Sequence, residues 1–159
     1  MLEIRNLSHT YEGGVQALHN VNLTVEDGEF LVVIGLSGSG KSTLMRCINR
    51  LVDPTEGQVL YNGIDVTAAS PEELRLIRRK IGMVFQHFNL VKRSTVLTNV
   101  LSGRLGYMPT VSSMFHRFPK TEIERAMANL KRVGIAEKAY ARADELSGGQ
   151  QQRVGIARA

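Results

Sequence analysis

The sequence is poor in cysteine, tryptophan and long apolar runs. Its 159 residues include one cysteine, Cys47, and no tryptophan. A single cysteine excludes an intramolecular disulfide, so we expect a reducing compartment such as the cytoplasm, with Cys47 packed as a small apolar side chain. The longest apolar run, Phe30 to Ile34, has the length of a strand, whereas roughly 20 apolar residues are needed to span a bilayer. The first residues, Met1 to Arg5, lack the basic and then apolar layout of a secretory signal.

Positive charge is in excess, but it is not massed in one region. The formal net charge is +5 and the isoelectric point is about 9.7, which raises the question of a nucleic-acid or anionic-membrane partner. The densest basic clusters are Arg78 to Lys80 and Arg117 to Lys120. Neither alternates with aromatic residues as single-strand binding surfaces do. Charge alone therefore does not decide the function, and no nucleic-acid partner is expected.

The order of predicted elements indicates an α/β domain. Ser70, Pro71 and Glu73 form the capping-box pattern of a helix start, as Thr121 and Glu124 do further on. The β-branched run from 29 to 34 predicts a strand buried on both faces. The predicted elements are strands at 2–5, 21–25, 29–34 and 81–85, a hairpin at 58–66 around Asn62-Gly63, and helices at 42–51, from Ser70, and from Thr121 to Gly134.

A glycine-rich segment stands between the predicted strand at 29–34 and the predicted helix at 42–51. Gly35 to Ser42 reads Gly-Leu-Ser-Gly-Ser-Gly-Lys-Ser and matches the phosphate-binding pattern G-x-x-x-x-G-K-[ST] in full. Its glycines let several backbone N–H groups converge on a phosphate, and the helix N-terminus adds partial positive charge. Lys41 suits the β- and γ-phosphates, and the Ser42 hydroxyl suits Mg²⁺. The plain alternative is a flexible Gly/Ser turn, but an accidental match in this context is rare, so the motif predicts nucleotide binding.

A second glycine motif, Leu146 to Gln150, reads Leu-Ser-Gly-Gly-Gln and is followed by Gln151-Gln152-Arg153. Ser147 can cap a helix, and Gly148 and Gly149 permit close backbone approach, which makes a second anion site. An ordinary capping box from Ser147 to Gln150 is the alternative. With a phosphate-binding loop about 100 residues earlier, this segment resembles the signature of ATP-binding-cassette (ABC) ATPases. The resemblance implies a P-loop core over about 1–90 with an antiparallel β subdomain, and a helical signature subdomain over about 91–159.

The resemblance also implies roles for single residues. Tyr11, ahead of Gly13-Gly14, is similar to the aromatic residue that stacks on adenine, and Gln86 is similar to the glutamine that contacts magnesium and relays nucleotide state to membrane subunits. Leu36 stands where many members carry proline, and since proline has no N–H, that position is not an essential phosphate donor. The residues implied to bind ATP are Tyr11, Gly35, Leu36, Ser37, Gly38, Ser39, Gly40, Lys41, Ser42, Thr43 and Gln86, with Ser42 and Gln86 on Mg²⁺; those implied to reach a partner chain's ATP are Leu146, Ser147, Gly148, Gly149 and Gln150.

The segment between Gln86 and Leu146 indicates a subgroup. Gly103 to Gly106, the stretch Met114 to Lys120, and Lys138 to Glu145 together are similar to the ATPases of bacterial phosphonate importers. The resemblance implies a homodimer of cassettes that sandwiches two ATP molecules, transmembrane permease subunits, and indirectly a periplasmic solute-binding protein. It places the protein at the cytoplasmic face of the bacterial inner membrane.

Three residues expected of such an ATPase do not occur after the signature in these 159 residues: a magnesium-binding aspartate, the adjacent catalytic glutamate and a switch histidine. The four histidines, His9, His19, His87 and His116, all precede the signature. We therefore expect a chain that is incomplete at its C-terminus, binds ATP and hydrolyses it negligibly, with open edges on the strand at 29–34. A soluble ABC-type ATPase acting on DNA or ribosomes, and a non-catalytic nucleotide-binding fragment, remain open alternatives.

Overall fold

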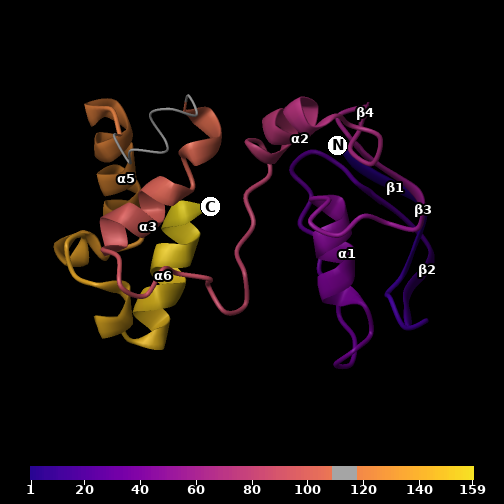
Figure 1. Cartoon of the computed structure of the whole chain (residues 1–159), viewed down its shortest axis with the longest axis horizontal. Helices are drawn as coiled ribbons and strands as arrows, with labels where there is room; N and C mark the ends of the chain where they lie inside the picture. Colours follow the sequence, from indigo (N-terminus) through magenta and orange to yellow (C-terminus); the bar gives the residue numbers. More distant parts are fainter. Residues whose placement is uncertain (109–117) are drawn as a thin grey trace. The chain divides into compact units, whose positions relative to one another are not determined.

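The computed structural model describes residues 1–108 and 118–159. Part of the insert used to predict the subgroup, from Met114 to Arg117, lies outside the described residues. The chain divides into two compact units, residues 1–81 and 82–159, which Figure 1 shows as a sheet with helices and as a helical body. The boundary near residue 90 between a P-loop core and a signature subdomain stays a prediction.

The first unit is built on one antiparallel sheet with strand order β2-β1-β3-β4. Its strands are β1 (Leu2–Thr10), β2 (Gln16–Val25), β3 (Glu56–Tyr61) and β4 (Ile64–Asp65). The predicted strands at 2–5 and 21–25 lie inside the longer β1 and β2. The predicted hairpin is confirmed, because Tyr61 pairs with Ile64 and both turn residues, Asn62 and Gly63, have positive φ. The antiparallel β subdomain is confirmed with it.

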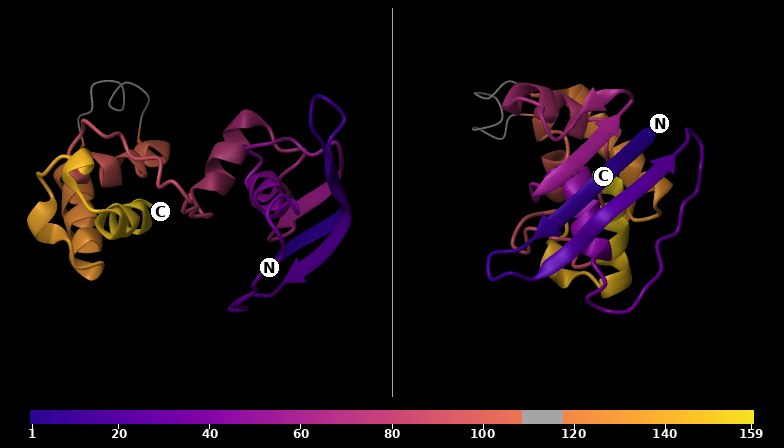
Figure 2. Two further views of the ribbon diagram at one scale, coloured as in Figure 1. Left: turned by 90° about the horizontal axis from the view of Figure 1, so that it is seen from below. Right: turned by 90° about the vertical axis from the view of Figure 1, so that its right-hand side faces the viewer.

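Helix α1 (Lys41–Ile48) packs on one face of this sheet (Figure 2, left). Leu44 and Cys47 of the helix are buried in one cluster with Ile4, Leu7 and Val59 of the strands. Cys47 is fully buried, as predicted, and burial raises the pKa of its thiol to about 11.

The helices of the first unit begin where the sequence predicts, but one ends early. Helix α2 (Pro71–Arg78) has the full predicted capping box between Ser70 and Glu73. Helix α1 ends at Ile48, three residues before the predicted end at Leu51. Arg50 has a φ of 47°, a left-handed conformation that turns the chain away, and Leu51 is exposed.

Two predicted strands do not form. The segment 29–34 pairs with no strand among the described residues, and Phe30 and Ile34 are 90% and 89% exposed rather than buried on both faces. The segment 81–85 is also without strand structure. An apolar run indicates burial, but a strand exists only where a second strand accepts and donates its backbone hydrogen bonds. No described residue supplies that second strand here.

The second unit is helical. It contains α3 (Val96–Ser102), α5 (Lys120–Arg132) and α6 (Gly148–Arg158), with 3₁₀ turns at Leu105–Tyr107, Ala136–Lys138 and Ala143–Glu145. The three α-helices pack against one another around buried Val100, Leu130 and Val154 (Figure 1).

The start of α5 corrects a second sequence prediction. The helix begins at Lys120 after Pro119, without a side-chain cap, so Thr121 lies inside it rather than capping it. Gly134, with a φ of 69°, stops the helix as predicted. Within the part of the chain that the structure describes, no helix is both long and apolar enough to cross a membrane.

Candidate functional site

The glycine-rich loop leads directly into α1. Gly40, the residue before the helix, has a φ of 86°, and a Cβ at this position would collide with the backbone carbonyl oxygen of Ala17 on β2. Only glycine fits both conditions. No side chain caps the first turn of α1, and none of its residues is acidic. The N–H groups of that turn and the partial positive charge of the helix end are therefore available to an anion.

Lys41 folds back over this loop. Its Nζ donates to the backbone oxygens of Gly35 at 2.8 Å and Leu36 at 2.6 Å, and to Ser39 Oγ at 3.1 Å. The ammonium group is thus held at the mouth of the loop, while residues 35–39 are exposed. The result is an open turn around one positive charge, formed by Gly35, Leu36, Ser37, Gly38 and Ser39. A positive charge that solvent can reach suits the binding of a polyphosphate chain.

Tyr11 lies on the same cavity as the loop. A cavity of about 270 Å³ is lined by Tyr11, by 15–17 at the start of β2, and by Gly38 to Thr43. The Tyr11 hydroxyl and Thr43 Oγ1 share a 2.9 Å hydrogen bond. The structure therefore brings together the predicted aromatic residue and the predicted phosphate loop, which the sequence separates by more than 20 residues. This cavity joins an aromatic ring to a cationic, amide-rich loop.

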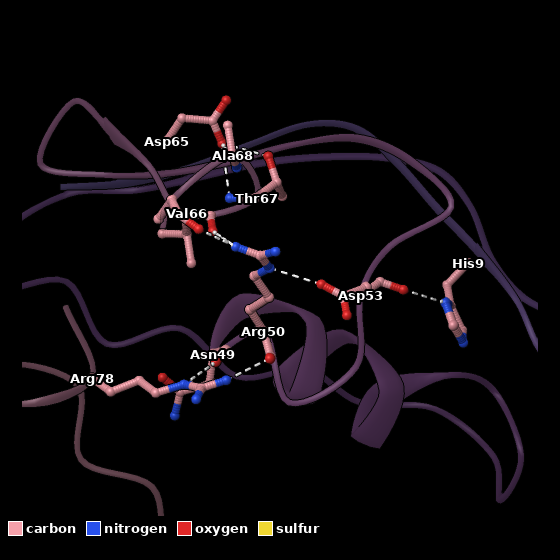
Figure 3. Close-up of polar contacts among 10 residues, drawn as sticks. His9, Asn49, Arg50, Asp53, Asp65, Val66, Thr67, Ala68 and Arg78 are labelled. Atoms are coloured by element: carbon pink, nitrogen blue, oxygen red, sulfur yellow. Dashed lines mark hydrogen bonds and ion pairs between the residues drawn. The ribbon is translucent and has the colours of Figure 1, made fainter. Parts of the chain in front are cut away.

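The far end of α1 is held by arginines (Figure 3). Arg78 of α2 donates from Nε to the Asn49 carbonyl at 3.0 Å and from Nη2 to the Arg50 carbonyl at 2.6 Å. Arg50 in turn donates to the Ala69 carbonyl and to Asp53 Oδ1, the latter at 2.7 Å. Cations at the carbonyl end of a helix complement its dipole. The C-terminal end of the helix that carries Lys41 is thereby held in place.

The signature segment caps α6. Ser147 Oγ accepts from the Gln150 N–H, and Gln150 Oε1 accepts from the Ser147 N–H, so the capping box is present. Leu146 is buried in the helical core. Gly148 and Gly149 are exposed, and a Cβ on either would meet no atom within 4 Å. The capping box leaves the outer surface of this helix end uncovered, so the capping and anion-binding interpretations are compatible.

The chain matches the family model described as ABC transporter over residues 18–159. That match covers most of the sequence and includes both glycine motifs. The chain belongs to the ABC transporter family. It has the ABC cassette fold of the P-loop NTPases, of which the described sheet, α1 and the helical unit are parts.

The relatives agree with this assignment. The chain is 59% identical over its whole length to the phosphonates import ATP-binding protein PhnC of Bacillus thuringiensis subsp. konkukian, and 58% identical to that of Shouchella clausii, covering 62% and 60% of those proteins. It therefore spans about three fifths of the length of these relatives. The solved cassette MJ0796, described as a dimeric bacterial ABC transporter cassette, is 39% identical with a TM-score of 0.85, over 99% of this chain and 68% of that one. A second structure of MJ0796 is a post-hydrolysis state bound to ADP and Pi.

Gln86 belongs to the second unit, whereas the residues of the glycine-rich loop belong to the first. Gln86 is exposed at the start of a turn, 86–89, in which Phe88 and Asn89 both have positive φ. Arg158 of α6 holds this turn, donating from Nη1 to the Asn89 carbonyl at 2.8 Å and from Nη2 to the Phe88 carbonyl. The turn that contains Gln86 is therefore attached to the signature helix.

The sequence did not indicate the residues whose side chains hold the backbone segments next to the candidate site residues. These residues form hydrogen bonds with backbone carbonyls far away in the chain, and no sequence motif marks them: His9, Arg50, Arg78 and Arg158.

Within residues 1–108 and 118–159, no three His, Cys, Asp or Glu side chains gather in a group that could hold a metal ion. Mg²⁺ often takes only one or two protein ligands and completes its shell with phosphate oxygens and water, so the Ser42 hydroxyl is a suitable ligand for an ion that arrives with a nucleotide.

Proposed function

We propose that the chain is the ATP-binding part of the cassette subunit of an ABC importer. The observation that carries this proposal is the loop from Gly35 to Ser42, open to solvent, with Lys41 at its mouth and an uncapped helix start behind it. The relatives that match along the whole chain are named as import ATP-binding proteins. Those names support an importer over a soluble ATPase that acts on DNA or ribosomes, which only the basic isoelectric point favours.

In this proposal each part of the cavity has one task. The loop amides and Lys41 hold the β- and γ-phosphates of ATP, while Thr43 and the α1 N-terminus lie under the phosphate chain. Ser42 would be a protein ligand of Mg²⁺ beside phosphate oxygens, and Gln86 is proposed as a second ligand because of its similarity to the glutamine of the family. Tyr11 stacks on adenine at the end of the cavity that β2 lines. Mg²⁺, when bound, neutralises charge between the β- and γ-phosphates.

The signature completes the site across a dimer. We infer that two cassettes pair head to tail, so that Leu146 to Gln150 of each chain covers the ATP held by the other. The exposed glycines at the start of α6 and the dimeric state of MJ0796 support this arrangement. The dimer would bind transmembrane permease subunits at the cytoplasmic face of the bacterial inner membrane and would serve a periplasmic solute-binding protein indirectly. No nucleic-acid partner is proposed.

The transported solute is proposed to be a phosphonate. Support comes from the names of the relatives at 58% and 59% identity, since the ATPase itself does not touch the solute. The test is complementation. A bacterium deleted for its own phosphonate import ATP-binding protein should regain growth on a phosphonate as the phosphorus source when it carries the complete gene. Growth restored on another solute, but not on phosphonate, would reassign the transporter.

ATP binding is tested by titration calorimetry on the polypeptide of these 159 residues. Mg·ATP should bind, and Lys41→Ala should weaken the affinity by about tenfold to a hundredfold, since a hydrogen bond from a charged donor contributes roughly 1.5–3 kcal/mol. Arg46→Ala is a matched control, because this basic residue lies on the same helix but in its last turn. Equal losses for both variants, or no binding by the folded wild-type chain, would contradict the proposal.

Hydrolysis is proposed to need residues beyond those present in this sequence. The 159-residue polypeptide has no aspartate–glutamate pair after the signature, and a positioned general base contributes roughly 10²–10⁴-fold to rate. Purified polypeptide should therefore release no phosphate above the Lys41→Ala background. Turnover that Lys41→Ala abolishes would show that these residues suffice.

A further inference from the structure

Tyr11 is restrained by contacts of both its backbone and its side chain. Its backbone N–H donates to the Val15 carbonyl at 2.9 Å, and its carbonyl accepts from the Gly14 N–H at 3.0 Å, which closes the turn between β1 and β2. Its hydroxyl is tied to Thr43 in the first turns of α1. The residue is nevertheless 37% exposed and lines the cavity, so part of it remains available to a ligand there.

The ring of Tyr11 has a second support, which is His9. The two rings meet edge to face, with centroids 4.5 Å apart and an interplanar angle of 89°. His9 is only 7% exposed and is not among the residues that line the cavity. It lies at the end of β1, two residues before Tyr11. An edge-to-face pair of this kind has a definite geometry, so it favours one orientation of the tyrosine ring over others.

His9 is itself fixed by a hydrogen bond that determines its tautomer (Figure 3). Its Nδ1 lies 3.0 Å from the Asp53 carbonyl oxygen. A carbonyl oxygen only accepts, so Nδ1 carries the hydrogen and donates. The other ring nitrogen, Nε2, is buried and has no hydrogen-bond partner among the described residues. The contribution of His9 therefore consists of one hydrogen bond and the contact of its ring with Tyr11.

These contacts form a closed path around α1. From Tyr11 the path enters the helix at Thr43, leaves it beyond its C-terminus at Arg50, and passes through the Asp53 carboxylate and carbonyl to His9 and back to Tyr11. The helix that carries Lys41 thus sets the position of the aromatic ring from both of its ends. Without His9, Tyr11 would retain only the Thr43 hydrogen bond and its turn.

We propose that His9 is a positioning residue for base recognition: it holds the Tyr11 ring in the orientation that stacks on the purine. The inference rests on the proposed function of Tyr11 and extends it to a residue that touches no nucleotide. Ordering of a flexible aromatic side chain costs free energy on binding, and a ring that is already oriented avoids that cost. His9 therefore strengthens the binding of the base and leaves the binding of the phosphates unchanged.

The experiment separates base from phosphates by comparing two ligands. Calorimetry gives the dissociation constants of Mg·ATP and of magnesium-loaded inorganic tripolyphosphate. The dissociation constant of tripolyphosphate divided by that of Mg·ATP is the ratio that measures what the nucleoside adds to the affinity. Two variants of His9 divide its contacts. His9→Asn keeps a hydrogen-bond donor near the Nδ1 position but has no ring, whereas His9→Phe keeps a ring but has no donor. Ser8→Ala is the matched control, because Ser8 is a buried neighbour on β1 whose hydroxyl accepts from the Asn20 N–H at 3.0 Å.

His9→Asn should lower the ratio by about twofold to tenfold, the range that an edge-to-face aromatic contact contributes, with the tripolyphosphate affinity unchanged. His9→Phe should keep the ratio within about twofold of the wild type. A ratio unchanged in His9→Asn would overturn the inference, and so would an equal fall in Ser8→Ala, which would mean that general loosening of β1 is the cause.

Failure of the proposed function would look different. If Lys41→Ala left both affinities intact, the phosphate site itself would be wrong. If Tyr11→Ala left the ratio intact while Lys41→Ala abolished binding, the base would not stack on Tyr11, and the inference about His9 would fall with that assignment. A third outcome would reject only the positioning role of His9 and leave the proposed function standing. In that outcome the phosphate site is intact, Tyr11→Ala changes the ratio, and His9→Asn does not.

Discussion

Two glycines of the phosphate loop allow a test of the backbone geometry itself. Gly38 and Gly40 have nearly equal φ values, 83° and 86°, but different surroundings. A Cβ on Gly38 would meet nothing within 4 Å, whereas a Cβ on Gly40 would overlap the Ala17 carbonyl oxygen and approach Leu18 Cδ2 to 3.2 Å. Replacing each by alanine adds the same strain of roughly 1–2 kcal/mol for a left-handed residue and the same entropic stiffening of the unfolded chain. The difference between the two variants therefore isolates the steric overlap.

Overpacking by one methyl group costs about 1–3 kcal/mol in a site that cannot relax, and Ala17 is held at the start of β2. We therefore expect Gly40→Ala to be about 1–3 kcal/mol less stable than Gly38→Ala. Hydrogen exchange of the β1 and β2 amides is the suitable assay, because it reports the opening free energy of the first unit alone. Equal losses for the two variants would refute the close approach of the loop to β2, whatever the size of either loss.

Three further outcomes follow from single side chains. Arg158→Ala removes both donors from the turn at 86–89 and should speed the amide exchange of that turn by roughly tenfold to a hundredfold. Arg153→Ala on the same helix, which loses one 3.3 Å bond, should change it little. Because the pKa of Cys47 is raised from 9.0 to about 11, the unfolded chain loses its thiol proton first. The unfolding free energy should then fall as the pH rises from 9 towards 11, and urea titrations should show a shallower fall in Cys47→Ala. Phe30→Lys should leave the stability of the first unit within about 0.5 kcal/mol of the wild type and reduce binding of a hydrophobic dye; a loss above about 3 kcal/mol in thermal melts would mean that Phe30 is buried.

Features that depend on near neighbours in the sequence could be predicted. The Asn62-Gly63 turn, the capping box of Ser70 and the stop at Gly134 are each determined within about four residues, and all three are confirmed. The phosphate loop belongs to the same group, because Lys41 reaches oxygens only two to six residues before it. A contiguous motif contains most of the geometry that such a loop needs.

Features that depend on distant partners could not be predicted. The segments 29–34 and 81–85 have the apolar composition of strands, but composition does not supply the strand beside them. Contacts of arginine side chains with backbone carbonyls could not be predicted either, because too many possible partners exist. Every residue but the last offers a carbonyl to its surroundings, so nothing in the sequence indicates that Arg158 binds those of Phe88 and Asn89 rather than others.

The same distinction explains why the phosphate part of the site is easier to recognise than its base part. In the proposed site, amides and a lysine within one short loop hold the phosphates, so phosphate recognition depends on consecutive residues. The proposed base contact is Tyr11, whose ring meets that of His9, and His9 is hydrogen-bonded to the carbonyl of Asp53, a residue 44 positions further along the chain. Replacement of the His9 ring should thus weaken base recognition without altering phosphate binding. A search for residues that tune base recognition in this cassette should accordingly begin at the end of β1, around His9, and not in the glycine loop.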